Sequence, residues 1–116
     1  MTSKVYYEGN LRTRCIHLKS GNEIITDAPI DNSGKGEAFS PTDTVATGLA
    51  SCMITMMGIK AEALDVSLGG TTAMVTKTMA TNPRRISRID VEVIVPTNVS
   101  EKSQKILENT AKTCPV

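Results

Sequence analysis

The stretch Ser40–Leu64 constrains the fold of this chain most strongly. Ser40 can cap the first free backbone amides of a helix, Pro41 suits the first helical position, and Asp43 stands where a capping-box acid belongs. About two dozen residues rising 1.5 Å each predict a helix of roughly 35 Å, about the width of a small domain. Because apolar residues occur almost all round this helix, we expect it to be buried, with the other elements built around it.

Short β-strands are predicted on both sides of this helix. Gly9-Asn10 and Ser20-Gly21-Asn22 are turn signals that separate three short strands, which predicts a meander over Lys4–Glu8, Thr13–Leu18 and Glu23–Asp27. After the helix, a second hairpin is predicted from Thr71–Ala80 and Ser87–Pro96, the latter with alternating Ile89, Val91, Val93 and Val95. A second helix is predicted from a cap at Asn98, with Glu101 as its partner, to about Thr113. This order predicts an α+β fold in a single domain, residues 1–116.

Composition narrows the function classes. The chain has 116 residues, a net charge of +1 and only 3% aromatic residues, which argues against nucleic acid or an anionic membrane as a partner. The run Val45–Ile59 is too short and too mixed to span a bilayer, and the N-terminus does not read as a signal peptide. We therefore expect a soluble cytoplasmic protein, in which three cysteines point to redox, catalytic or metal chemistry.

The thiol of Cys52 is the candidate reactive group. A free cysteine is among the most buried residue types, so a packing role is the first alternative. Small residues surround Cys52, however, and would let a substrate approach the thiol: Ala46, Thr47, Gly48, Ala50 and Ser51. Cys114 lies near the end of the second helix, where unpaired carbonyls disfavour a thiolate, so Cys52 is the better nucleophile of the two. For Cys114, a resolving role and a packing role remain open.

A buried thiol needs a partner that stabilises its thiolate. Arg12 and Arg14 lie two residues apart on one strand and could supply a guanidinium, although a solvated strand face is the default interpretation. His17 is better explained as structural or exposed. A Cys3His zinc site from Cys15, Cys52, Cys114 and His17 lacks C-x-x-C spacing, so we expect no metal.

Several motifs resemble the OsmC/Ohr family (osmotically inducible protein C and organic hydroperoxide resistance protein). The resemblance covers almost the whole chain, and two cysteine motifs in the right order make it specific. The matching stretches are Tyr7–Thr13, Ser20-Gly21, Thr26-Asp27-Ala28-Pro29, Phe39–Asp43, Ala50-Ser51-Cys52-Met53, Gly58-Ile59, Asn82–Ile86 and Thr113-Cys114-Pro115-Val116.

The resemblance implies an intertwined homodimer in which β-sheets wrap around long central helices. It implies a thiol peroxidase that reduces organic hydroperoxides in oxidative or osmotic stress defence. Cys52 then becomes a sulfenic acid that Cys114 closes to a disulfide. Arg12 resembles the family's arginine, with Arg14 as the alternative, and Arg14, Asp43 and Met56 are candidate substrate-binding residues. No cofactor is implied beyond an external dithiol or lipoyl-type reductant.

Two departures from the family pattern stand out. Thr42 occupies the position of a family Glu that pairs with the arginine, and Asp43 or Glu37 could replace it. The family also continues past the Cys-Pro-Val motif through closing strands that are absent here, so we expect an incomplete chain or a second sheet short of strands. The alternative function is a weakly redox-active dimer that binds a lipophilic small molecule.

Overall fold

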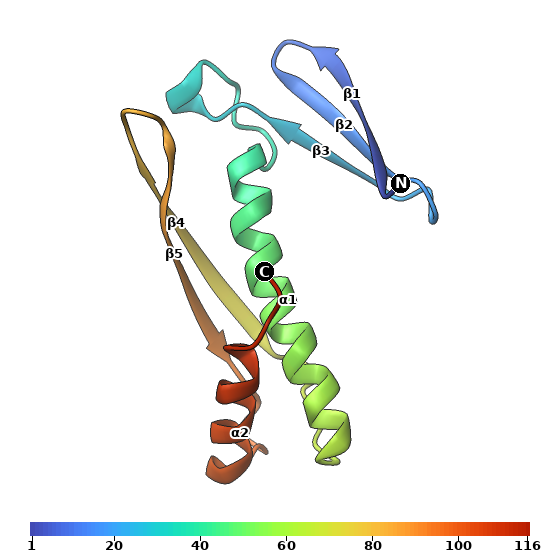
Figure 1. Cartoon of the computed structure of the whole chain (residues 1–116), viewed down its shortest axis with the longest axis vertical. Coiled ribbons are helices and arrows are strands. Elements are labelled where there is room, and N and C mark those ends of the chain that lie inside the picture. The colour runs from blue at the N-terminus through green and yellow to red at the C-terminus, as the bar shows by residue number, and fades with distance from the viewer. The chain divides into compact units, whose positions relative to one another are not determined.

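The computed structural model describes all residues, 1–116, and has an α+β fold of two helices and two antiparallel sheets (Figure 1). In chain order the elements are β1 (Ser3–Gly9), β2 (Arg12–His17), β3 (Glu23–Asp27), the short 3-10 helix η1 (Ile30–Asn32), α1 (Pro41–Ala63), β4 (Thr72–Ala80), β5 (Arg85–Ile94) and α2 (Glu101–Ala111). The chain divides into two compact units, unit 1 (Met1–Thr44) and unit 2 (Val45–Val116).

Unit 1 contains the predicted three-stranded meander, in the order β1-β2-β3. The register places Val5 opposite Cys15, and Cys15 opposite Ile24, so these three residues share one face of the sheet. The β1–β2 turn passes through the left-handed region at Gly9 (φ 84°) and Asn10 (φ 55°), residue types that tolerate it. The Gly9-Asn10 turn signal is thus confirmed.

The loop from Ala28 to Phe39 folds tightly back on the sheet. The Ala28 N–H donates to the Leu11 carbonyl at 3.0 Å, and the Gly36 N–H donates to the Ala28 carbonyl at 3.2 Å. A Cβ at Gly34 would lie 1.7 Å from the Ala28 carbonyl oxygen, so only glycine fits there. This loop is therefore firmly anchored next to the β1–β2 turn.

The start of α1 has the capping box that the sequence predicts. The Asp43 N–H donates to Ser40 Oγ at 3.1 Å, and the Ser40 N–H donates to Asp43 Oδ2 at 2.9 Å. Ser40 is almost fully buried. These two hydrogen bonds satisfy amides at the helix entrance that have no partner within the helix.

Unit 2 holds the apolar core. Met57 and Ala61 of α1 pack with Val99 and with Leu107 and Ala111 of α2. Half-buried side chains from α1, from the segment after it, and from β5 and the residue that follows it complete this cluster (Met53, Leu64, Val66, Leu68, Val93 and Val95). The predicted hairpin forms with Val91 opposite Val75 and Val93 opposite Ala73.

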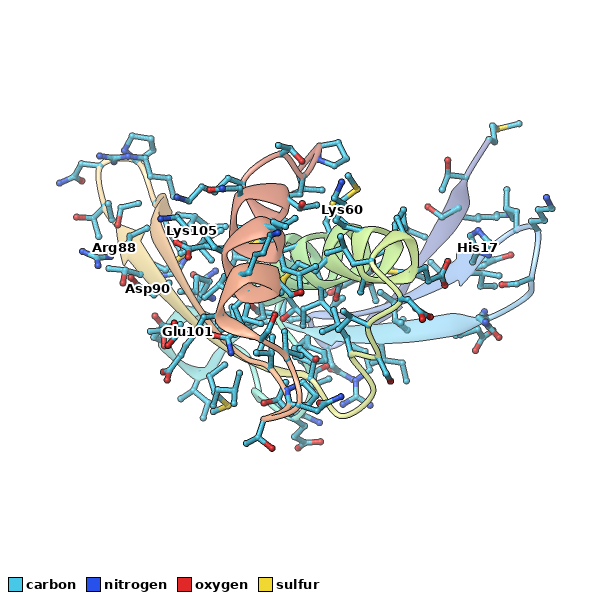
Figure 2. All side chains as sticks on the ribbon, turned by 90° about the horizontal axis from the view of Figure 1, so that it is seen from below. His17, Lys60, Arg88, Asp90, Glu101 and Lys105 are labelled. Atoms are coloured by element: carbon cyan, nitrogen blue, oxygen red, sulfur yellow. The ribbon has the colours of Figure 1, made fainter.

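Charged side chains also occupy the β4–β5 hairpin. Arg88 Nε lies 2.9 Å from both carboxylate oxygens of Asp90, and Figure 2 shows the two labelled side chains on this hairpin. Both side chains are largely exposed to solvent. Exposed pairs of this kind contribute little to stability.

The second helix begins later than the sequence predicts. Its N-cap is Ser100, whose Oγ accepts a hydrogen bond from the Ser103 N–H at 3.2 Å, so the prediction of Asn98 as the cap is wrong. Ser and Asn are nearly equal as caps, and the position of the first helical turn decides between them. The helix ends at Ala111 rather than near Thr113.

The predicted burial of α1 holds for one stripe only. Ala46, Ala50, Met57 and Ala61 are buried, whereas Val45 and Ile59 are more than half exposed. By length and composition alone α1 could cross a membrane, a test that core helices of soluble proteins also pass. The sequence shows which residues of α1 are apolar, but it does not show how much of their surface the rest of the chain covers.

We predict that Ser40→Ala removes a helix cap and destabilises the protein by about 1 kcal/mol. The midpoint of thermal unfolding should then fall by roughly 3–6 °C. Ser51→Ala is the matched control, because Ser51 is exposed within α1 and alanine is the better helix former. An equal or larger loss in Ser51→Ala would contradict the capping role.

Candidate active site

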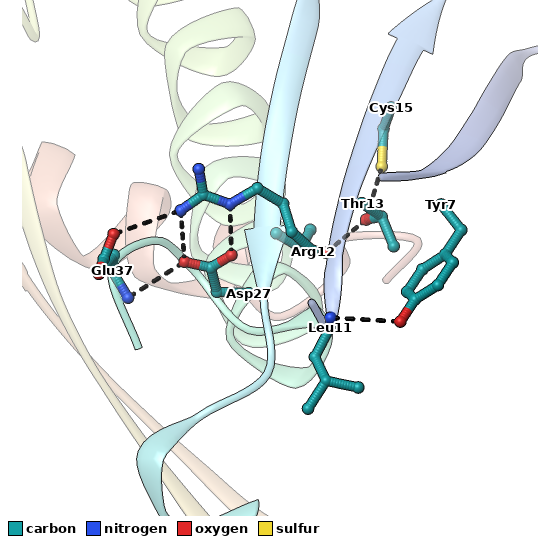
Figure 3. Close-up of polar contacts among 8 residues, drawn as sticks. Tyr7, Leu11, Arg12, Thr13, Cys15, Asp27 and Glu37 are labelled. Carbon is teal, nitrogen blue, oxygen red and sulfur yellow. Dashed lines mark hydrogen bonds and ion pairs between the residues drawn. The ribbon is translucent and has the colours of Figure 1, made fainter. Parts of the chain in front are cut away.

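Arg12 and Asp27 form the best-defined polar pair in unit 1 (Figure 3). Arg12 Nε donates to Asp27 Oδ1 at 2.7 Å, and Nη2 donates to Oδ2 at 2.8 Å, which is a two-point guanidinium–carboxylate contact. Asp27 is 2% exposed, whereas the Arg12 side chain is 38% exposed. The pair therefore joins a buried acid to an arginine that still reaches solvent.

Strand register brings these two residues together. Arg12 is the first residue of β2 and lies opposite Asp27, the last residue of β3. The Asp27 N–H donates to the Phe39 carbonyl at 3.0 Å, and the Glu37 N–H donates to Asp27 Oδ2 at 3.2 Å. The carboxylate thus accepts hydrogen bonds from both the sheet and the anchored loop.

These hydrogen bonds shift the pKa values of both Asp27 and Arg12. The hydrogen bond from Arg12 is the largest cause that lowers the pKa of Asp27, against an opposing effect of burial. The same bond raises the pKa of Arg12. Both groups are therefore charged at neutral pH.

Asp27 is the residue that sequence reasoning missed. Of the two acids expected to pair with Arg12, Glu37 comes within 3.5 Å of Nη2, and Asp43 forms the capping box with Ser40. The signal for Asp27 was present in the predicted meander, where the end of the third strand lies beside the start of the second. Pairing Asp27 with Arg12 requires knowledge of the strand register, which the alternation of residue types does not determine.

Arg14 belongs to a separate cluster on the same sheet. Its Nε lies 2.6 Å from Glu8 Oε1, its Nη1 lies 2.9 Å from Glu23 Oε1, and its guanidinium stacks on Tyr6 at 4.5 Å from the ring centroid. The hydrogen bonds that Arg14 donates to Glu8 and Glu23 raise the pKa of Arg14. Both acids that hold Arg14 are exposed, whereas Arg12 has the buried Asp27 as its main partner.

The cysteines are all free thiols and all half-buried. Cys52 lies in the middle of α1, and Cys114 follows α2, where its N–H donates to the Ala111 carbonyl at 3.4 Å. Both belong to unit 2, whereas Cys15 lies in β2 of unit 1. Nowhere in residues 1–116 do three or more His, Cys, Asp or Glu side chains gather in a way that could hold a metal ion.

An apolar cavity of about 340 Å³ lies in unit 2, among α1, β5 and α2. Met53 and Met57 form its α1 wall, and Val91, Val93 and Leu107 form much of the rest. Gln104, Glu108 and Lys112 supply polar groups from α2. Met56, the methionine proposed from the sequence, is half-buried and is not among the lining side chains.

Residues 34–116 match the family model described as OsmC-like protein. The chain belongs to the OsmC-like family. This confirms the resemblance drawn from the sequence motifs, and the α+β architecture agrees with it. No curated protein sequence gives a significant match.

Several solved structures share this fold. A protein from Psychrobacter arcticus 273-4, described as an osmotic stress induced and detoxification response protein, is 59% identical with a TM-score of 0.95, over 99% of this chain and 84% of that chain. An OsmC-like protein from Mycoplasma pneumoniae is 19% identical with a TM-score of 0.79, over 97% and 81% of the two chains. An organic hydroperoxide resistance protein from Vibrio cholerae O1 biovar eltor str. N16961, with captopril in one active site, is 15% identical with a TM-score of 0.72, over 99% and 81%.

We predict that the Arg12–Asp27 pair makes the stability of this OsmC-like chain acid-sensitive. The folded-state pKa of Asp27 lies below the unfolded value of about 3.9, so the pair stabilises the fold fully above that pH. Its contribution is lost as the pH falls through the lower folded-state pKa. Urea unfolding of the wild type and Asp27→Asn should show a stability gap that is constant from about pH 5 to 7 and shrinks below about pH 4.

The control for this titration is Asp90→Asn, which removes an exposed ion pair with Arg88 and should open little or no gap. A gap between wild type and Asp27→Asn that stays constant down to about pH 2 would contradict the assignment.

Proposed function

We propose that this protein is a thiol-dependent peroxidase that reduces organic hydroperoxides in the cytoplasm as part of a stress response. The observation that carries the proposal is membership of the OsmC-like family together with a half-buried free thiol, Cys52, among small residues of α1. The description of the 59% identical Psychrobacter protein supports a detoxification role, and that of the Vibrio protein supports hydroperoxides as the substrate class.

The proposed reaction has two steps in the protein. The Cys52 thiolate attacks one oxygen of the hydroperoxide, the O–O bond breaks, and the alcohol leaves after taking up a proton, which yields a Cys52 sulfenic acid. The Cys114 thiolate then attacks the Cys52 sulfur and expels water after protonation, forming a Cys52–Cys114 disulfide. An external dithiol or lipoyl-type reductant restores both thiols by exchange.

Arg12 is the proposed catalytic guanidinium. A fixed positive charge favours a thiolate and the negative charge that develops on a peroxide oxygen. The buried acid Asp27 orients Arg12 through two short contacts, whereas the acids that hold Arg14 are exposed, which supports Arg12 over Arg14 for this role. Arg14, Asp43 and Met56 remain proposed substrate-binding residues.

We also propose that the protein works as a homodimer. The face of the unit 1 sheet that carries Val5, Tyr7 and Ile24 leaves these side chains 60%, 68% and 57% exposed. No apolar side chain of unit 1 is buried, although a small sheet needs a covered apolar face to be stable. A second copy of the chain is the proposed cover.

A binding module is the second candidate function. The cavity of about 340 Å³ in unit 2 is within the size range of small-molecule sites, and its walls are mainly apolar. A dimer with weak redox chemistry could hold a lipophilic molecule there. Hydroperoxide turnover separates the two functions directly.

We predict that Cys52→Ser abolishes cumene hydroperoxide consumption in the presence of dithiothreitol, because the nucleophile is lost. Cys114→Ser should keep the first turnover and accumulate a sulfenic acid at Cys52, detectable by dimedone labelling and mass spectrometry. Cys15→Ser is the matched control and should retain wild-type turnover.

Peptide mapping of the peroxide-treated wild type should identify a Cys52–Cys114 disulfide. A disulfide that involves Cys15 instead would contradict the assigned roles. Absence of turnover in a folded wild-type protein, with a lipophilic ligand bound, would favour the binding module.

We predict that Ile24→Asp shifts the protein from dimer to monomer in sedimentation velocity, because a charge on the apolar face opposes its burial. Ile25→Asp is the control on the neighbouring residue, which points to the opposite face. Circular dichroism distinguishes a folded monomer from an unfolded chain. Equal sedimentation of the two variants as dimers would contradict the proposed interface.

A further inference from the structure

The guanidinium of Arg12 has two edges with different surroundings. Its Nε–Nη2 edge is engaged by Asp27, with both contacts below 2.9 Å. Its outer edge consists of Nη1 and the second N–H of Nη2. Figure 3 shows this edge directed away from Asp27, with Nη1 making no drawn contact.

Glu37 reaches this outer edge only weakly. Its Oε2 lies 3.5 Å from Nη2, too far for a hydrogen bond of ordinary length, and its side chain is 64% exposed. Its backbone is anchored, because the Glu37 N–H donates to Asp27 Oδ2 at 3.2 Å. The Glu37 carboxylate is thus held near Arg12 by its main chain while its side chain can turn into solvent.

The two acids therefore contact the same guanidinium in unequal ways. Asp27 is buried, makes two short contacts and leaves the charge of Arg12 balanced. Glu37 is exposed, makes one long contact and adds a negative charge next to the outer edge. Removal of Asp27 would change the orientation of Arg12, whereas removal of Glu37 would leave that orientation and open the outer edge.

We propose that the outer edge of Arg12 is a binding site for a small carboxylate-type monoanion, that Asp27 is its positioning residue, and that Glu37 is a tethered competitor displaced by the ligand. Two parallel N–H groups of a guanidinium match the two oxygens of a carboxylate, which defines the ligand class. This inference rests on the proposed function in one respect only: the carboxylate would occupy the Arg12 edge that the proposed function assigns to the thiolate and the peroxide oxygen.

Acetate is the probe that tests the site without hydroperoxide turnover. The Arg12 Nε–H and Nη signals are followed by ¹⁵N NMR of the full chain at pH 7, while acetate replaces chloride at constant ionic strength. In the wild type the Nη signals should shift with acetate, and the Nε signal bound to Asp27 should shift less. Glu37→Gln should bind acetate roughly twofold to fivefold more tightly, because an exposed competing charge is removed.

Three variants complete the test. In Asp27→Asn the Nε–H of Arg12 should exchange with solvent faster than in the wild type. This variant should also bind acetate more weakly, although Glu37 is intact. Arg12→Lys keeps the charge without the two-pronged geometry and should also bind more weakly. Asp90→Asn, which removes the exposed acid paired with Arg88, should bind acetate as the wild type does.

Equal acetate affinity in the wild type and Glu37→Gln would overturn the competitor role of Glu37. Wild-type or tighter acetate affinity in Asp27→Asn would overturn the positioning role of Asp27, because loss of its charge alone would favour the anion. These outcomes are independent of peroxidase activity. If the wild type turns over no hydroperoxide, the proposed function fails. The acetate titration still tests whether the outer edge of Arg12 binds a carboxylate. If turnover is found, acetate should inhibit it in competition with cumene hydroperoxide, because both would use the outer edge of Arg12.

Discussion

The buried carboxylate of Asp27 connects the separate parts of unit 1. It accepts hydrogen bonds from the Arg12 side chain at the start of β2 and from the Glu37 backbone in the loop before α1. Its own N–H donates to Phe39, directly before the helix cap Ser40. The buried residues of unit 1 are Thr26, Asp27 and Ser40, all polar. Polar contacts therefore hold unit 1 together, whereas apolar packing holds unit 2 together.

This arrangement links the sheet to the start of the helix that carries Cys52. The chain runs from Asp27 through a loop that closes over Gly34 and Gly36, and enters α1 at a capping box. Each step is fixed by a local requirement, either a glycine with no room for a side chain or a backbone amide that needs an acceptor.

Sequence reasoning recovered the features that depend on local patterns. The meander, the hairpin and the entry of α1 follow from alternation, turn residues and the Ser40–Asp43 spacing, and the two cysteine motifs identified the family. It missed Asp27, because a cross-strand partner depends on register, and it placed the cap of α2 at Asn98 rather than Ser100. It also expected burial all round α1, which a count of apolar residues cannot establish when Val45 and Ile59 remain exposed.

An ion pair with a buried acid is a poor choice if stability is the only requirement. Removing the Asp27 carboxylate from water is costly, and an apolar contact of similar size often stabilises a fold as well or better. Unit 1 nevertheless gives its most deeply buried acid to Arg12, while several of its apolar side chains remain exposed. What the pair supplies that an apolar contact could not is a guanidinium with fixed charge and fixed orientation. A fixed charge with a fixed orientation is what recognition of an anion requires. It is the physical reason to regard Arg12 as a functional residue rather than an ordinary surface charge.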